Sequence, residues 1–376
     1  MKSVAYRSIL LSVLMITSSL AGCLGDEAED ADDSEQIVDP ITVFGSVMVS
    51  TYHVGELVKA VAGEHVEMHY MSQDNIPVHD YEPSAADLIR LQEADVFFYH
   101  GLNLEPWVDS ALESLGADAP ASFMTHTMMD GEVTLDFESL LVSNLCELMN
   151  DGPFESTTLA TMSDDHDDHD DHDDHSDDED DHDDHGDEIE ADGDEEAFDY
   201  DPHSWLDPLS FKEQANLVMM KLTLTFPDGA DVFADNYEAY SSQLTQLDDS
   251  FEAAFGEQGT CASGGHDKTI VANHNAYSYI SVRYDIDILT VHGLDPEGEP
   301  SPAEVAEVVE HIKEEGITVL FVEEYTDQSA VQSIVEETGV EMQILYTMEM
   351  RPSDNTDHYL SMMNKNIVNI VTGIGC

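Results

Sequence analysis

ADVFFYH at residues 94–100 and ITVLFVEEY at residues 317–325 decide the fold class of this 376-residue chain. Each is a short, continuous apolar run rich in β-branched and aromatic residues, which is typical of a strand buried on both faces. Segments with helical spacing of apolar residues flank each run. Strands that alternate with helices predict parallel sheets, because parallel neighbours need a crossover connection that a helix can supply.

The same alternation continues outward from both runs. In the first half we expect strands at 41–50, 66–71, 94–100 and 121–127, and helices at 52–62, 84–91 and 104–115. In the second half we expect strands at 268–274, 286–293, 317–325 and 340–347, and helices at 277–282, 302–315, 328–337 and 357–371. Between the halves lie helices at 208–225 and 230–255. Apolar residues of the longer one form a single stripe: Val232, Phe233, Tyr237, Tyr240, Leu244 and Leu247.

These elements predict an α/β fold of two lobes, each a mainly parallel sheet flanked by helices, joined by a long rigid helix. The expected boundaries are 41–207 for the N-terminal lobe, 208–258 for the connecting helices and 259–376 for the C-terminal lobe. An acidic insert at about 150–199 interrupts the first lobe. Ligands of open parallel sheets bind beyond the carboxyl ends of the strands, so a cleft between the lobes is the expected site.

The N-terminus predicts export and a lipid anchor. Lys2 and Arg7 precede an apolar stretch, 9–20, that is short for a membrane span and ends in Leu-Ala-Gly-Cys23. Small residues before a cysteine resemble a lipobox, in which residues 1–23 form the signal and Cys23 becomes acylated. The alternative is an ordinary signal peptide with an incidental cysteine. Residues 24–40 are acidic and read as a flexible tether, which places the protein on the outer face of the membrane.

The formal net charge of −71 is extreme, with 82 Asp and Glu against 11 Lys and Arg. Fewer than half of these acids lie in the two acidic segments, so the charge extends over the whole chain. Such a surface repels nucleic acid and attracts cations, and it also suits a high-salt environment. Nucleic acid is therefore excluded as a partner.

A run of DDH units lies between residues 163 and 186, SDDHDDHDDHDDHSDDEDDHDDHG. It holds no apolar residue, so it cannot form a core and should be solvated. Imidazoles on a flexible tether can bind divalent cations such as zinc weakly. The alternative is a merely acidic, solubilising loop. The auxiliary weak ligands would be His166, His169, His172, His175, His182 and His185.

Four residues outside the run lie where the cleft should open. His79 follows a strand, His203 stands in DPHSWLDP, His274 ends a strand, and Glu349 follows the last strand. Three neutral imidazoles and one carboxylate would form a tetrahedral zinc shell. Their spacings carry no motif by themselves, and a single histidine in a loop is more often structural.

Longer motifs supply the context that spacing lacks. The chain resembles the zinc/manganese-type solute-binding lipoproteins of ABC transporters, the family of the periplasmic zinc-binding protein ZnuA. The resemblance covers nearly all of 41–376, and its His-rich insert has the position found in zinc-specific members. The motifs that carry it are LVKAVAGEHVE, HDYEPSAADLIRLQEADVFFYHGLNLEPW, DPHSWLDP, ANHNAYSYI, GLDPEGEPSPAEV and LSMMNKNI.

The resemblance implies His79, His203 and His274 as the first three ligands. Manganese-selective relatives typically have a glutamate at the third position, so His274 favours Zn²⁺ over Mn²⁺. The fourth family ligand is usually an aspartate, whereas this chain offers Glu349. The longer carboxylate can still reach the metal, or water can complete the shell. Glu323 and Glu324 are expected to point toward the cleft as a nearby acidic wall, and Glu324 is a weaker rival for Glu349.

Other histidines lack a supporting pattern. His100 stands where the family often has a non-ligating asparagine, and it is expected to be a loop residue or to hydrogen-bond a ligand. Trp107 and Trp205 are expected in the core. We interpret the remaining histidines as surface or structural residues: His53, His65, His69, His126, His266, His292, His311 and His358.

The cysteines beyond the leader are Cys146, Cys261 and Cys376. One pair is plausible in an oxidising compartment, but the sequence alone cannot choose it. Some relatives have a cysteine at each of the last two positions, so the resemblance implies a disulfide between Cys261 and Cys376, with Cys146 free.

The resemblance implies a monomeric zinc-binding lipoprotein that delivers Zn²⁺ to a membrane-embedded ABC permease with its cytoplasmic ATPase. The alternatives are a manganese- or iron-specific protein of the same class, or an extracellular zinc buffer or adhesin without a transporter. No catalysis is expected, since the chain has no G-x-S-x-G, P-loop or HExxH pattern. A zinc hydrolase would need a general base beside a three-histidine site.

Overall fold

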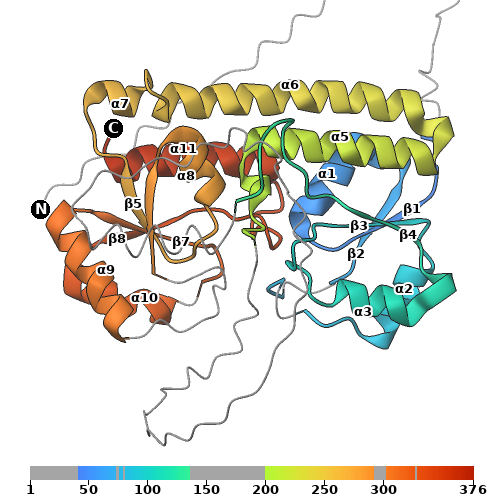
Figure 1. Ribbon diagram of the computed structural model, residues 1–376, viewed down its shortest axis with the longest axis horizontal. Coiled ribbons are helices and arrows are strands. Elements are labelled where there is room, and N and C mark those ends of the chain that lie inside the picture. The colour runs from blue at the N-terminus through green and yellow to red at the C-terminus, as the bar shows by residue number, and fades with distance from the viewer. Residues whose placement is uncertain (1–40, 73–75, 79–80, 136–199, 292–301, 327) are drawn as a thin grey trace, which may run out of the picture. The chain divides into compact units, whose positions relative to one another are not determined.

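The computed structural model describes residues 41–376 except 73–75, 79–80, 136–199, 292–301 and 327 (Figure 1). The expected leader, its Cys23 and the tether lie outside the described residues. So do His79, His292, Cys146 and the DDH run with its six histidines. In the described part, no helix combines the length and the apolar composition that crossing a membrane requires.

The first sheet contains β1 (Ser46–Val49), β2 (Glu67–Tyr70), β3 (Val96–Tyr99) and β4 (Ala121–Met124), all parallel, in the order β2-β1-β3-β4. Its helices are α1 (Tyr52–Ala62), α2 (Ala85–Gln92) and α3 (Val108–Leu115). We call this sheet with these helices the first lobe. Ser84 begins α2 with a capping box to Asp87, and Gly63 ends α1 at a positive φ of 54°.

The second sheet repeats the order of the first. Its strands, again all parallel in the order β6-β5-β7-β8, are β5 (Thr269–Ala272), β6 (Asp287–Thr290), β7 (Val319–Val322) and β8 (Glu341–Ile344). The helices are α8 (Ser278–Tyr284), α9 (Pro302–Glu315), α10 (Gln328–Thr338) and α11 (Tyr359–Ile374). We call this set the second lobe. The predicted α/β class with parallel sheets is confirmed.

The strand order fixes where a ligand site should lie. In each sheet the chain first moves to one neighbour of the starting strand and then returns to the other side. The switch points therefore lie between β1 and β3 and between β5 and β7. Loops that leave the carboxyl ends of these strands diverge and open a crevice.

Two helices between the lobes have the predicted bounds, α5 (Pro208–Thr225) and α6 (Ala230–Phe255). They lie side by side, and α6 also contacts α1, α8 and α11 (Figure 1). Asn236 in α6 donates to the carbonyl of Val61 at 2.9 Å, and Asp248 in α6 accepts from Tyr284 at 2.9 Å. The α6 helix is thus bonded to both lobes. Its predicted stripe packs into the main core.

Two local predictions need correction. The helix expected from residue 104 begins only at Val108, because Gly101, Leu102 and Asn103 have positive φ and the following residues complete a turn. A short helix, α7 (Thr260–Gly264), was not expected. Its five residues are too few to give an apolar period, so the sequence carried no signal for it.

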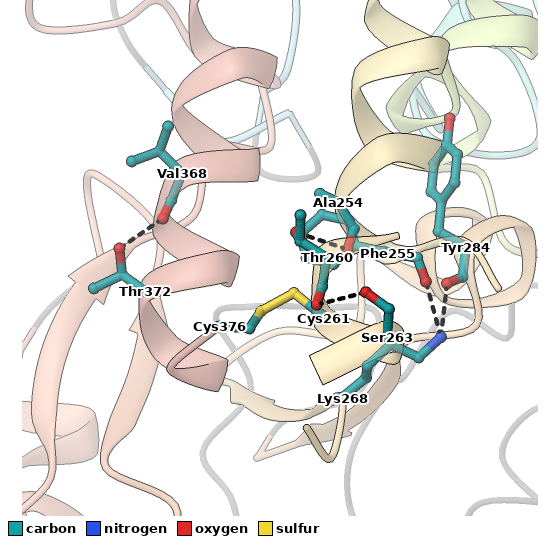
Figure 2. Close-up of a disulfide and its surroundings, with 10 residues drawn as sticks. All are labelled: Ala254, Phe255, Thr260, Cys261, Ser263, Lys268, Tyr284, Val368, Thr372 and Cys376. Atoms are coloured by element: carbon teal, nitrogen blue, oxygen red, sulfur yellow. Dashed lines mark hydrogen bonds between the residues drawn. A yellow bond between two sulfur atoms is a disulfide. The ribbon is translucent and has the colours of Figure 1, made fainter. Parts of the chain in front are cut away.

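A disulfide joins Cys261 in α7 to Cys376 at the end of the chain, with Cα atoms 5.1 Å apart (Figure 2). This is the pairing that the resemblance implied. Beside it, the Lys268 ammonium donates to the carbonyls of Phe255 and Tyr284, at 3.1 and 3.2 Å (Figure 2). The bridge and this lysine connect α11, α7 and the last residues of α6 and α8 near the start of β5.

Replacing Cys261 by serine should destabilise the chain. The disulfide closes a segment of 115 residues, so removing it increases the conformational entropy of the unfolded chain. A loss of about 2–5 kcal/mol is expected from the behaviour of native disulfides. Denaturant unfolding of Cys261→Ser, Cys376→Ser and the double variant measures it, and the three should agree.

Cys146→Ser is the matched control, because it removes a cysteine that is not part of the bridge. It should unfold as the wild type does. Equal stability of the wild type and Cys261→Ser under oxidising conditions would contradict a structural bridge.

Candidate metal centre

Three buried groups from distant parts of the chain converge at one point. Within the described part of the chain, His203, His274 and Glu349 form the only cluster with metal-ligand composition, with one ligand atom of each lying within 4.8 Å of the others. His203 precedes a short 3₁₀ helix (Ser204–Leu206) before α5, His274 follows β5, and Glu349 follows β8. The centre therefore lies at the carboxyl end of the second sheet, next to the segment that leads from the first lobe into α5.

Asp201 fixes the orientation of His203. Its Oδ1 accepts from the Nδ1 of His203 at 2.7 Å and from the backbone N–H of the same residue at 2.9 Å. A carboxylate can only accept, so Nδ1 carries a hydrogen, and in the neutral ring the lone pair lies on Nε2. Among the described residues this buried Nε2 has no hydrogen-bond partner, and Oε1 of Glu349 lies 3.5 Å from it.

Glu323 fixes the orientation of His274 in the same way. Its Oε1 lies 2.6 Å from Nδ1 of His274, and its Oε2 accepts from the hydroxyl of Thr347 at 3.1 Å. Both oxygens of this carboxylate are thereby positioned, and in the neutral ring the lone pair of His274 lies on Nε2. The rings of His203 and His274 have centroids 5.0 Å apart. A carboxylate behind each imidazole is the arrangement that orients histidines in zinc sites.

A strained turn brings Glu349 to the centre. Met348 has a φ of 60° although it is not glycine, and such a conformation costs about 1–3 kcal/mol. The turn is held from the other side by Trp205, whose indole N–H donates to the carbonyl of Thr347 at 2.6 Å. Strain of this kind persists where surrounding contacts determine the conformation, and it is common at ligand sites.

The spacing of the groups suits a small cation. Nitrogen and oxygen ligands lie about 2.0–2.2 Å from tetrahedral zinc, which places two ligand atoms about 3.3–3.6 Å apart. The 3.5 Å between Nε2 of His203 and Oε1 of Glu349 already matches this separation. Neutral imidazole nitrogen and carboxylate oxygen are both ordinary zinc ligands.

Nearby carboxylates raise the pKa values of the two histidines at the centre. Burial by itself lowers the pKa of His203, but the charge and hydrogen bond of Asp201, together with Glu349, outweigh it and raise the pKa to about 9. Burial likewise lowers the pKa of His274, and Glu323 followed by Glu349 outweighs it, so the pKa is raised. Three carboxylates thus favour positive charge here, whether it comes from protons or from a metal ion.

The other site residues expected from the sequence fall into different places. His79 lies outside the described residues, but its neighbours Val78 and Tyr81 line a pocket that Glu349 borders. Glu324 does not join the centre, because its carboxylate accepts from the backbone and the hydroxyl of Ser353. Glu324 is therefore not among the described groups that converge at the centre.

Three further histidines lie behind Trp205, which is fully buried as expected of a core residue. The His53 ring stacks on Trp205 at 3.8 Å, and its Nε2 lies 3.2 Å from Nδ1 of His100. His126 bonds Ser204 at 2.8 Å. The sequence predicted His53 and His126 as surface or structural residues, and His100 as a loop residue or one that hydrogen-bonds a ligand. The structure makes all three part of the packing.

Burial is the main cause of their low basicity. It lowers the pKa of His53 to about 3 and that of His126 to about 4, and it lowers the pKa of His100 well below the ordinary value. These rings are therefore uncharged at neutral pH. They support Trp205, and through it the turn before Glu349, without adding charge. No motif marks them, because each comes from a different element and only the fold brings them together.

The described residues that flank 136–199 are hydrogen-bonded to each other beside the centre. The N–H of Asp201 donates to the carbonyl of Leu135 at 2.9 Å. The hydroxyl of Tyr279 in α8 donates to the carbonyl of Asp201 at 2.8 Å and accepts from the N–H of Leu135 at 3.1 Å. The contacts that position the segment of His203 are therefore made by Leu135, Asp201 and Tyr279, none of which lies within residues 136–199.

Comparison with known sequences agrees with this architecture. The chain is 25% identical over 328 residues to the zinc-binding lipoprotein AdcA of Streptococcus pneumoniae, which covers 86% of this chain and 54% of that protein. The chain thus spans about half the length of that relative. It is 23% identical over 376 residues to the manganese-binding lipoprotein MntA of Halalkalibacterium halodurans, covering 100% of this chain and 99% of the relative.

Solved structures show the same fold. The Zn(II)-bound ZnuA-like domain of Streptococcus pneumoniae AdcA superposes with a TM-score of 0.63 at 22% identity, covering 88% of this chain and 99% of that one. The laminin-binding protein Lmb of Streptococcus agalactiae, described as bifunctional with adhesin and metal-transporting activity, gives the same TM-score, identity and coverage.

One family accounts for nearly the whole described chain. Residues 47–373 match the family described as ZnuA, zinc-uptake complex component A, periplasmic. The matched range includes both sheets and all three converging groups. The chain belongs to the ZnuA family.

Proposed function

We propose that this protein captures Zn²⁺ outside the cytoplasm, between its two lobes, and delivers it to an ABC permease. The observation that carries the proposal is the convergence of two carboxylate-backed imidazoles and the buried Glu349 carboxylate. In the proposal His79 adds a third imidazole. The site takes the ion as cargo, and no catalytic step is required.

The donor set favours zinc over manganese. Imidazole nitrogen suits zinc, whereas manganese prefers carboxylate and other oxygen ligands. The two relatives named above are called zinc-binding and manganese-binding, so their names do not choose between the metals. Two imidazoles against one carboxylate at the centre support zinc.

Transport is the proposed context of this binding. The family is described as a component of a zinc-uptake complex, and both relatives are called lipoproteins. In the proposal, acylated Cys23 anchors a monomer outside the cell membrane, and the DDH run collects cations near the cleft. A tethered collector raises the local concentration of cations without taking part in the tight site.

A zinc titration of the full chain tests the tight site. The wild type should bind one zinc ion tightly. His274→Ala should lower the affinity for that ion by more than about 100-fold, which exceeds the loss typical of a residue that only orients a ligand. A chain lacking residues 163–186 should keep the tight ion, because Leu135 and Asp201 are bonded to each other on the near side of the insert. Competition with a chelator of known affinity measures all three.

The deletion separates the two candidate locations of zinc. Loss of the tight ion on deleting 163–186 would show that the run, and not the interlobe centre, binds it. The same titration with Mn²⁺ as competitor tests the metal. Manganese should fail to displace zinc at equal concentrations.

Glu323→Gln should lower the zinc affinity by about 10–100-fold, the usual effect of removing a carboxylate that orients a histidine ligand. The amide keeps the shape but can present its N–H₂ to Nδ1 of His274, which favours the wrong ring tautomer. Glu324→Gln is the matched control, since the neighbouring carboxylate contacts Ser353 instead. Equal losses in the two variants would contradict the orienting role.

Zinc binding should release protons and strengthen as pH rises. His203 holds a proton below a pKa of about 9, and a metal ion must displace it. At pH 7.5 calorimetry in buffers of different ionisation enthalpy should therefore find at least one proton released per zinc. Asp201→Asn removes the charge that raises this pKa, so it should release fewer protons. An affinity independent of pH between 7 and 9 would contradict this account.

A further inference from the structure

One arginine of the second lobe reaches across to the first. Arg351 lies two residues after Glu349, and its Nη2 donates to the carbonyl of Ser72 at 3.2 Å. Its guanidinium carbon also lies 4.4 Å from the centroid of the Tyr70 ring. Tyr70 is the last residue of β2, so a single side chain bridges segments 279 residues apart in sequence.

Both ends of this contact are anchored within their own lobes. On the second lobe, the carbonyl of Arg351 accepts from the hydroxyl of Tyr325 at 2.8 Å. On the first lobe, Tyr70 packs on α1, where a Cβ at Gly55 would lie only 2.2 Å from the Tyr70 hydroxyl oxygen. Gly55 therefore makes room for the tyrosine. The contact joins two fixed surfaces rather than two loose side chains.

The contact lies in the wall of a pocket that Glu349 of the candidate centre also lines. Tyr70, Ser72, Glu349 and Arg351 all line it. Ser72 begins the segment that continues to Val78, another residue of the same wall, and to His79 next in sequence. Arg351 thus ties the segment carrying Glu349 to the residues at and just after the end of β2.

We propose that Arg351 is an interlobe latch, a positioning residue that holds the lobes together over bound zinc and slows its dissociation. This inference rests on the proposed function. A planar guanidinium can stack on a ring and donate to a carbonyl at the same time, whereas a lysine ammonium is a compact charge without that geometry. The latch breaks when the lobes separate, so it acts on the ion after capture.

Stopped-flow dissociation from the full chain tests the latch. Protein loaded with one equivalent of zinc is mixed with excess chromogenic chelator. Arg351→Ala should dissociate about tenfold faster, equivalent to roughly 1.4 kcal/mol. The association rate constant should stay within about twofold. Arg351→Lys should also be fast, because it keeps the charge but loses the planar contact.

Tyr70→Leu removes the other partner and supplies a double-mutant cycle. It should speed dissociation by itself, and the combination with Arg351→Ala should be no faster than Arg351→Ala, because both changes break the same contact. Lys365→Ala is the control. That lysine lies 5.4 Å from the Tyr346 ring centroid inside the second lobe, and its removal should leave the dissociation rate unchanged.

Each outcome decides between the two claims. A wild-type dissociation rate in Arg351→Ala, or full retention by Arg351→Lys, would overturn the latch. Additive effects of Arg351→Ala and Tyr70→Leu would do the same. A wild-type chain that holds no slowly dissociating zinc would instead contradict the proposed function. Thermal unfolding of Arg351→Lys and Tyr70→Leu checks that a faster rate does not come from unfolding.

Discussion

The candidate centre depends on a pair of carboxylate–imidazole hydrogen bonds, from His203 to Asp201 and from His274 to Glu323. Burying polar rings is unfavourable unless their hydrogen bonds are satisfied. The two carboxylates satisfy one nitrogen of each ring and set which nitrogen is left for an ion. They also supply negative charge in a dry environment, where it acts more strongly than in water.

The surrounding fold can be understood as the support of these bonds. Tyr279 of α8 binds both ends of the insert, and Tyr359 of α11 donates to the carbonyl of Trp205 at 2.6 Å. Trp205 in turn bonds Thr347, beside the strained turn at Met348. Aromatic side chains with one polar atom therefore connect the lobes around the centre. They bury large apolar surfaces and still satisfy a backbone group with each hydroxyl or indole N–H.

Local sequence signals predicted most of the fold. The bounds of α1, α5, α6 and α9 follow directly from apolar spacing and from terminal residues such as Gly63, Pro208 and Pro302. The candidate site could be predicted less well from the sequence. His203, His274 and Glu349 share no spacing motif. Their positions where the cleft should open made them candidates, and the family resemblance then supported the two histidines.

The residues that support the candidate ligands could be predicted from the sequence only in part. Asp201 could have been noticed, because an aspartate two residues before a histidine can bond its ring locally. Glu323 was seen as an acidic neighbour, but its bond to His274 joins two strands and depends on their register. His53 and Arg351 gave no signal, since their partners lie far away in sequence.

The three converging groups are divided unequally between the lobes. His274 and Glu349 follow strands of the second sheet, whereas His203 belongs to the segment entering α5. A small displacement of one lobe would therefore leave an ion with an incomplete shell on the second lobe. In the proposed function, two protein ligands would then remain on the second lobe, and water or another acceptor could replace the missing ligand. The second lobe would be the last holder of the ion.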